Sequence, residues 1–334
     1  MANISIRVYT ILMLGKTPNG IYKKYFGVRQ FTKTFPDEES CENRLFELKY
    51  PDGFICQKCK HNQYYRLKGS GFKRKRLLQC RYCKKQISLT AETVFEGTKV
   101  SLYQWFWAIF LVTQTKKGIS GWQLSKQIGV SEATARLILY KLRREMEEDT
   151  ITYQIGGPDK IIEMDEFEIG GVNNIKQNSL ILLEKSKKGR LGRVRFAPMA
   201  DETTKTLELN ALPQIAVGSR LHTDGKKTYK KLAERYFKRI SLEQVAHWEE
   251  NHSHEFLNDL NTIVGNLKNW YRGTHHSFAL KNSAYYMNEF AYRFNRRRSE
   301  TDIFNRLLVR SITRAKKLKR RVLFSESQYL PLAA

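Results

Sequence analysis

The sequence predicts a chain of the α/β class, with a mixed sheet preceded by a small cysteine-bearing module and a helical region. Three observations predict this order. Four cysteines stand in two close pairs before residue 84. Amphipathic and apolar helical segments follow up to residue 148. Beyond the Gly156-Gly157-Pro158 break, the pattern changes to strand-like segments separated by helices.

The elements before that break follow from local patterns. Residues 1–35 show no clear period and no motif, so we expect a loosely attached N-terminal extension. A short helix follows and closes at the Pro51-Asp52-Gly53 turn, and residues 54–90 alternate polar and apolar positions as short strands do. Leu102–Thr115 is apolar and aromatic enough for a buried helix. Residues 119–148 predict two helices around a turn at Gly129.

After the break, strands are expected at 160–169, 178–185, 193–199 and 219–223, with a helix at about 203–211. Long helices are expected at 255–271 and 280–297, and a basic helix at 300–322. The predicted divisions of the chain are the extension (1–35), the cysteine module (36–95), the helical region (96–150), the α/β domain (158–298) and a basic C-terminal helix and tail (299–334).

The charge of the chain narrows the classes of function. Its 334 residues include 59 Lys+Arg and 33 Asp+Glu, a formal net charge of +26. Such an excess is unusual for a metabolic enzyme with a small anionic product. The 41% hydrophobic and 12% aromatic content argues against a disordered basic tail protein. The charge therefore favours binding of a polyanion, usually nucleic acid. The alternatives are a basic surface kept for solubility and attraction to an anionic membrane.

Targeting signals are not evident. The longest apolar run, Trp105–Val112, is eight residues, whereas a membrane-spanning helix needs roughly 20. Residues 1–14 lack a continuous apolar core followed by a cleavage site. We therefore expect a cytoplasmic protein without a membrane partner, associated with the nucleoid if the source is bacterial.

Two cysteine pairs predict a structural zinc site. Cys56, Cys59, Cys80 and Cys83 form C-x2-C-x20-C-x2-C. Each close pair can present two thiolates to one tetrahedral ion, and the span between the pairs is long enough for a hairpin. Four sulfurs close the coordination sphere, so the Zn²⁺ is expected to be structural. The fifth cysteine, Cys41, is expected to be an ordinary buried thiol.

The segment 119–144 is typical of a helix-turn-helix. Gly129 suits the turn, Ser131 suits the N-cap of the second helix, and apolar residues supply an inner stripe. A DNA-reading helix of this kind would carry its contacts on the outer face, where we expect Thr134, Arg136, Tyr140, Lys141 and Arg143. The alternative is an ordinary helical hairpin.

Acidic residues mark two of the predicted strands. Alternation along 161–169 places Glu163, Asp165 and Phe167 on one face and Glu166 and Glu168 on the other. A second acid, Asp224, ends the 219–223 strand. Aspartates at the ends of neighbouring strands can hold Mg²⁺ for phosphoryl transfer. Solvated strand edges and ion pairs with the many lysines are the alternative.

The order of these parts resembles the DDE transposases of bacterial insertion sequences, specifically the ISXO-like group with an N-terminal zinc ribbon. The resemblance covers about residues 35–298. Besides the zinc ribbon and helix-turn-helix, its motifs are Phe35-Pro36-Asp37-Glu38-Glu39-Ser40-Cys41, Glu163-Met164-Asp165-Glu166 with Gly170-Gly171, His222-Thr223-Asp224-Gly225, Gly273-Thr274-His275-His276 and the segment 288–297.

The resemblance implies a catalytic set of two aspartates, a third polar residue and a Lys seven positions after it. Asp165 and Asp224 fit the first two, and Asn261 with Lys268 fits the rest, because seven residues are two helical turns. The broader superfamily usually has Glu third, and this group also uses Asn or His. Glu250 and Glu255 are rival ligands without that spacing. A solvated helix face is the alternative for Asn261 and Lys268.

The resemblance further implies an RNase H-like catalytic domain, two Mg²⁺ ions, cleavage of DNA at the terminal repeats of the element, and transfer of the 3′ ends to target DNA. Its partners would be double-stranded DNA and at least one more copy of the chain. Arg293, Arg296 and Arg297 form a basic cluster where phosphate contacts are expected. Two other functions remain open: an inactive zinc-ribbon and helix-turn-helix regulator, and an RNase H-like nuclease without strand transfer.

Overall fold

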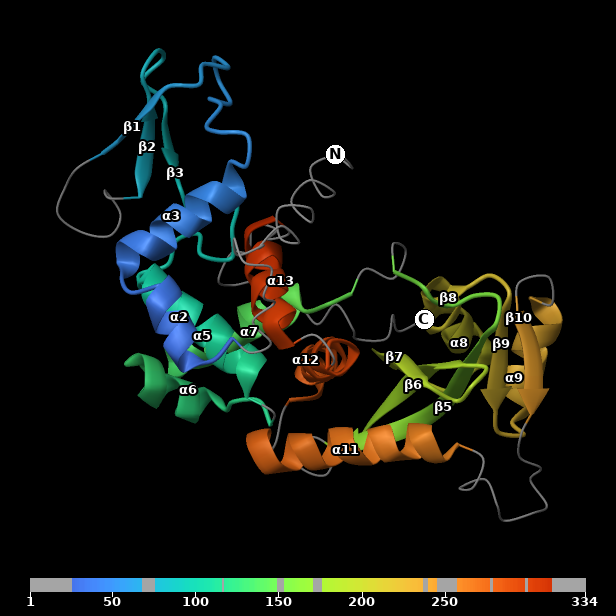
Figure 1. The fold of residues 1–334 in the computed structure, drawn as a ribbon. Helices are drawn as coiled ribbons and strands as arrows, with labels where there is room; N and C mark the ends of the chain where they lie inside the picture. The colour runs from blue at the N-terminus through green and yellow to red at the C-terminus, as the bar shows by residue number, and fades with distance from the viewer. Residues whose placement is uncertain are drawn as a thin grey trace. The chain divides into compact units, whose positions relative to one another are not determined.

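The computed structural model describes residues 26–67, 76–115, 117–148, 153–170, 176–236, 240–244, 257–276, 279–297 and 300–313 (Figure 1). These residues fall into two compact units. The N-terminal unit contains the described residues up to 145 together with 300–313, and the C-terminal unit contains those from 146 to 297. The division after residue 145, and the place of 300–313 in the first unit, differ from the boundaries that the sequence suggested.

The N-terminal unit combines a small sheet with helices. Its three-stranded antiparallel sheet has the order β1-β2-β3, with β1 at Tyr64–Arg66, β2 at Leu77–Cys80 and β3 at Gln86–Ser88. The helices are α2 (Val28–Thr34), α3 (Glu38–Lys49), α5 (Leu102–Gln114), α6 (Gly121–Ile128), α7 (Glu132–Glu145) and α13 (Glu300–Thr313).

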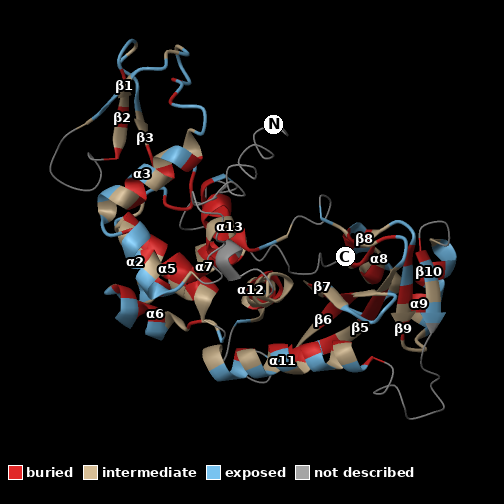
Figure 2. Cartoon of the chain, in the orientation of Figure 1, coloured by how far each residue is buried: buried red, intermediate tan, exposed pale blue. Residues whose placement is uncertain are grey.

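The core of this unit is aromatic. Phe31 of α2 is fully buried, with its ring 4.4 Å from that of Trp107 and 4.8 Å from that of Phe110. Phe304 of α13 is also fully buried and lies beside Phe106 and Phe110 of α5. Figure 2 shows buried positions on both helices. Both ends of the described chain therefore supply core helices. The expectation of a loose extension is wrong for residues 28–34, and residues 1–25 lie outside the described residues.

The helix predicted at 300–322 is a core helix in its described part. Ile303, Phe304, Leu307 and Leu308 of α13 are buried. Their i, i+1, i+4, i+5 spacing makes one apolar stripe on the helix. The basic residues from Arg314 onward lie outside the described residues.

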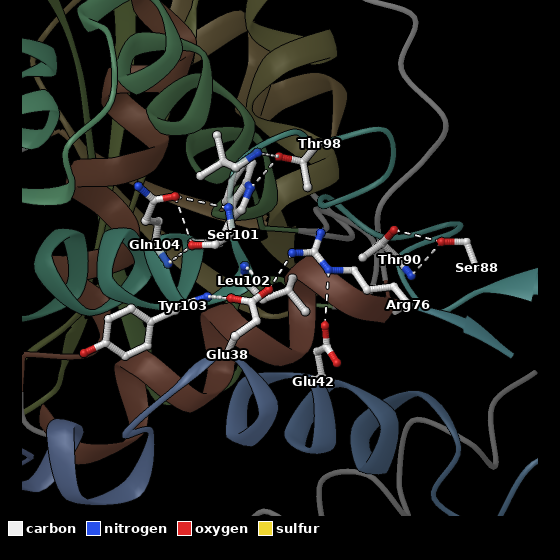
Figure 3. A network of polar contacts seen from close by, with 12 residues as sticks. Glu38, Glu42, Arg76, Ser88, Thr90, Thr98, Ser101, Leu102, Tyr103 and Gln104 are labelled. Carbon is white, nitrogen blue, oxygen red and sulfur yellow. Dashed lines mark hydrogen bonds and ion pairs between the residues drawn. The ribbon is translucent and has the colours of Figure 1, made fainter. Parts of the chain in front are cut away.

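A polar network joins α3, β2 and α5 (Figure 3). The Glu38 carboxylate accepts hydrogen bonds from the backbone N–H groups of Leu102 and Tyr103, each at 2.9 Å, and so caps α5. The same carboxylate pairs with Arg76 at 2.5 Å, and the Arg76 side chain, 4% exposed, also faces Glu42. Arg76 is thus a buried link within the unit.

The C-terminal unit contains a mixed five-stranded sheet of order β10-β9-β5-β6-β7. The strands are β5 (Lys160–Gly170), β6 (Lys176–Ser186), β7 (Leu191–Pro198), β9 (Ser219–Thr223) and β10 (Ile240–Gln244). Strands β5, β6 and β7 are antiparallel, whereas β9 is parallel to β5 and β10 is parallel to β9. The four predicted strands are confirmed, and β10 was not predicted.

Helices cover both faces of this sheet. They are α8 (Thr204–Asn210), α9 (Lys227–Arg235), α11 (Asn258–His275) and α12 (Ser283–Asn295), with short 3-10 turns η2 (Leu212–Gln214) and η3 (Leu280–Asn282). A further two-stranded pair joins β4 (Ile155–Gly156) to β8 (Ile215–Ala216). One core contains Ile162 and Met164 of β5 with α8 and α9, and the other contains Phe167 and Ile169 with α11 and α12 (Figure 1). Across the described ranges, no helix is long and apolar enough to span a membrane.

Candidate functional site

The four paired cysteines come together in the N-terminal unit. Their Sγ atoms all lie within 4.8 Å of one another, with Cys56–Cys83 and Cys59–Cys80 both at 3.5 Å. Sulfurs at about 2.3 Å from a tetrahedral zinc ion are about 3.8 Å apart, so this cluster suits a structural Zn²⁺.

The two cysteine pairs lie in turns of the same form. In each, the fourth residue after the first cysteine has a positive φ: 62° at Lys60 and 58° at Lys84. Its N–H donates to the carbonyl of that cysteine, at 2.9 Å for Cys56 and 3.2 Å for Cys80. This repetition presents each pair of thiols to one point. Cys41 lies apart and is fully buried, and burial raises the pKa of its thiol, as expected for an ordinary buried thiol.

The segment predicted as two helices around a turn has that local structure. α6 ends at Gly129, whose φ of 68° is left-handed, and the N–H of Thr134 donates to the Ser131 hydroxyl at the start of α7. Arg136 projects outward, with 73% of its side chain exposed, and pairs with Glu132 at 2.5 Å. Thr134 and Tyr140 are half-buried.

Two of the residues expected on the outer face point inward. The Lys141 ammonium donates to the Val94 carbonyl at 2.9 Å and lies over the Trp105 ring. Burial lowers the pKa of Lys141. Arg143 is buried, with 6% exposed. The sequence prediction of an outward orientation is therefore wrong for these two residues, because the apolar stripe of α7 is broad enough to include their aliphatic stems.

The predicted aspartates, Asp165 and Asp224, lie at the same height along the neighbouring parallel strands β5 and β9. In the register of β5 and β9, Glu163 is paired with His222. Two residues further along the two strands come Asp165 and Asp224, so both carboxylates lie at the same height in the sheet. Burial and then the charge of Asp224 raise the pKa of Asp165 to about 7. Such a pair gains from taking up either a proton or a cation.

The carboxylate of Glu166, the residue after Asp165, has a different environment. Glu166 points to the opposite face of β5, is 3% exposed, and pairs with the ammonium of Lys226 at 2.7 Å. The Lys226 ammonium also pairs with Glu202 at 3.0 Å. The backbone N–H of Lys226 donates to the Asp224 carboxylate at 3.1 Å. Lys226 therefore fixes the segment that carries Asp224 to the back of the strand that carries Asp165. Only the alternation of acids was visible in the sequence, and no local signal indicated this long-range pair.

One flank of α11 is held against β6 and α12. Asp259 in its first turn pairs with Lys185 of β6 at 2.5 Å, and Lys185 also pairs with Glu163 at 2.8 Å. Three turns later, the Trp270 ring lies 5.8 Å from that of Phe290 in α12. The buried stripe of the helix, beside that flank, comprises Leu260, Ile263, Val264, Leu267 and Tyr271.

Asn261 and Lys268 lie on the other flank of α11. They are half-buried and seven residues apart, so they share a face on the side of the buried stripe away from Asp259 and Trp270. No hydrogen bond or ion pair among the described residues joins either side chain to Asp165 or Asp224. Glu250 and Glu255 lie outside the described residues.

The basic cluster at the end of α12 is engaged within its own unit. Arg293 pairs with Glu289, and Arg296 pairs with Glu148 at 2.5 Å while lying over the Tyr292 ring. The Arg297 guanidinium donates to the carbonyls of residues 191, 192 and 294. These contacts hold the end of α12 to the neighbouring β7 edge. They do not support the phosphate contacts that the sequence suggested for the three arginines.

Comparison with known protein families gives a match in each of the two units. Residues 157–295 match the ISXO2-like transposase domain, and residues 36–86 match a transposase zinc-ribbon domain. The chain is similar, at 29% identity over 137 residues, to an uncharacterized protein in transposable element ISH50 of Halobacterium salinarum. That stretch is 41% of this chain and 44% of the relative, so the match spans less than half of either protein.

A solved structure is similar at a lower level. It is a chain of the simian T-cell lymphotropic virus intasome in complex with PP2A regulatory subunit B56 gamma, with a TM-score of 0.31 and 16% identity. The similarity covers 50% of this chain and 62% of that one.

Proposed function

Since the chain belongs to the ISXO2-like transposases with an N-terminal zinc ribbon, we propose that it cleaves DNA at the ends of its element and joins the freed 3′ ends to target DNA. The family implies an RNase H-like fold for the C-terminal unit, with which the β10-β9-β5-β6-β7 sheet agrees. The zinc ribbon and the α6–α7 region would bind DNA, and the C-terminal unit would carry out phosphoryl transfer.

This proposal rests on the observation that Asp165 and Asp224 lie at the same height on neighbouring strands. Burial of Asp165, and then the charge of Asp224 on the neighbouring strand, raise the affinity of Asp165 for positive charge. A divalent cation between them relieves that repulsion, and carboxylate oxygens are the ligands that Mg²⁺ prefers. The donor set therefore fits Mg²⁺.

In this proposal, Asp165 and Asp224 hold the cations, Asn261 completes the ligand set, and Lys268 contacts a phosphate oxygen. When bound, Mg²⁺ lowers the pKa of the attacking oxygen and stabilises charge on the leaving oxygen. Their helix, α11, packs on the face of β5 that also carries Asp165, and this supports the roles of Asn261 and Lys268. Lys226 and Glu166 act as positioning residues, since they fix the segment of Asp224 against β5.

We further propose that α6, the Gly129 turn and α7 act as a helix-turn-helix that contacts double-stranded DNA. The exposed Arg136, with Thr134 and Tyr140 beside it, would face the DNA. Trp122 of α6 is 60% exposed and lies near the ammonium of Lys126, which adds a second contact surface. The net charge of +26 favours this partner. Because two element ends must be joined, the active form would be at least a dimer.

The test is Mg²⁺-dependent cleavage and joining of a DNA that carries the element ends, with wild type and Asp165→Ala side by side. We expect the variant to bind DNA as wild type does and to lose cleavage by at least about a thousandfold. Glu168→Ala is the matched control, because this exposed carboxylate of the same strand faces away and pairs with Lys176. Equal cleavage by wild type and Asp165→Ala would contradict the catalytic assignment.

The same assay separates the other two functions. A wild type that binds but never cuts would be a regulator, and one that cuts without joining would be a nuclease. Asn261→Ala is expected to lose strand transfer and keep DNA binding. Asn266→Ala, on an exposed position of the same helix, is its control. Unchanged transfer in Asn261→Ala would move the third ligand to Glu250 or Glu255.

A further inference from the structure

A glycine lies in the middle of α11, where no contact within the described residues requires the absence of a side chain. Gly265 is the eighth residue of this 18-residue helix. Glycine in a helix interior is less stable than alanine, because it loses more backbone freedom on folding. Some internal cause or some external ligand is therefore expected to require it.

The other glycines show what an internal cause looks like. A Cβ at Gly156 would lie 2.3 Å from the Ser219 hydroxyl, and one at Gly192 would lie 2.4 Å from the Glu184 carboxylate. Gly129 has a positive φ that other residues rarely adopt. Gly265 has neither reason: its φ is helical, and beyond its own stretch of helix backbone no atom of the described residues lies within 4 Å of a Cβ built on it.

The position of Gly265 indicates what occupies this space. It lies four residues after Asn261 and three before Lys268, so all three share one flank of α11, which packs on the face of β5 that carries Asp165. Arg272, seven residues on, is exposed and continues the same flank. No carboxylate among the described residues pairs with Lys268 or Arg272. The flank thus offers two cations beside a stretch of bare helix backbone.

We propose that the sugar-phosphate backbone of the DNA strand being cut lies against α11 at Gly265, with Lys268 and Arg272 on its phosphates. This inference rests on the function proposed above and adds the path of the strand. Without a side chain at residue 265, the strand can approach the helix closely enough for its phosphorus to reach the cations of Asp165 and Asp224. A methyl group there would hold the strand away from the reacting position.

The test compares Gly265→Ala with Gly273→Ala. Gly273 lies in the same helix, also has no atom of the described residues within 4 Å of a built Cβ, and faces away from this flank. Both variants are expected to raise the thermal midpoint by about 2 °C, because alanine favours the helix. Only Gly265→Ala should lower the cleavage rate, by about tenfold, and Gly265→Leu should lower it further.

Four outcomes would overturn the inference. Wild-type cleavage by both Gly265 variants, with Asp165→Ala inactive, contradicts the strand path and leaves the proposed function intact. A lower thermal midpoint for Gly265→Ala means that the chain itself fills the space. An equal fall in cleavage for Gly273→Ala means that the effect is not specific to this flank. A wild type that does not cleave at all contradicts the proposed function and, with it, the strand path.

Discussion

The cysteine cluster and the aspartate pair are built in different ways. The cysteines lie in two turns of the same form, each closed by its own backbone hydrogen bond, so the ligand geometry is encoded locally. The aspartates lie 59 positions apart in the sequence and meet only because β9 pairs with β5 in one register. A local site depends on its turns, whereas an assembled site depends on the whole sheet and on the contacts that fix its strands.

The largest effect is expected at the local site. Cys56→Ser should abolish zinc binding and unfold the ribbon, because metal binding to such small modules contributes on the order of 10 kcal/mol to folding. Limited proteolysis between residues 54 and 90, with the zinc content of the full chain, measures this. Cys41→Ser is the control and should retain zinc. A ribbon that resists protease after chelation would contradict the zinc assignment.

The two sites also differ in how far the sequence predicts them. The cysteine spacing and the strands at 160–169 and 219–223 were visible in local patterns. The pairing of Glu166 with Lys226 was not, because 60 positions separate the partners and the strand pairing that joins them is nonlocal. Lys141 was misplaced because its charge suggested solvent, although its ammonium lies over the Trp105 ring and donates to the Val94 carbonyl. The stripe of Ile303, Phe304, Leu307 and Leu308 has helical spacing in the sequence, but the basic residues around it led to the prediction of a basic helix rather than a core helix.

The next largest effect tests whether the contacts of Lys226 hold the segment that carries Asp224 in place. Lys226→Met leaves the buried Glu166 carboxylate without its cation, so we expect a loss of about 3 kcal/mol in the free energy of unfolding. Denaturant titration measures this loss. Lys227→Met, at the exposed neighbouring position, should change stability by less than about 0.5 kcal/mol. Equal stability of the two variants would show that Lys226 does not fix the Asp224 segment.

A smaller effect concerns the titration of Asp165 in Mg²⁺-free buffer. The pKa of Asp165 in the folded chain, about 7, is above its unfolded value of about 4. Its contribution to stability is therefore fully present below pH 4 and is lost as the pH rises through 7. Asp165→Asn lacks this titration, so it should be about 2 kcal/mol more stable than wild type at pH 5.5. That advantage should decrease toward pH 4, and an advantage independent of pH would refute the raised pKa.

The smallest effect is expected at the outer face of α7. Arg136→Ala should weaken binding of double-stranded DNA by about tenfold and reduce the salt dependence by about one charge. Arg44→Ala removes the same charge from α3, away from α6 and α7, and should leave affinity within about twofold. Equal losses in the two variants would mean that general charge, rather than α7, binds the DNA.

The most direct test of the central claim, that Asp165 and Asp224 together hold divalent cations, is Mn²⁺ binding measured by electron paramagnetic resonance. Wild type should bind Mn²⁺, and Mg²⁺ should displace it. Asp165→Asn and Asp224→Asn should each lose this binding, while Glu168→Gln on the same strand retains it. Wild-type Mn²⁺ binding in both aspartate variants would contradict the claim.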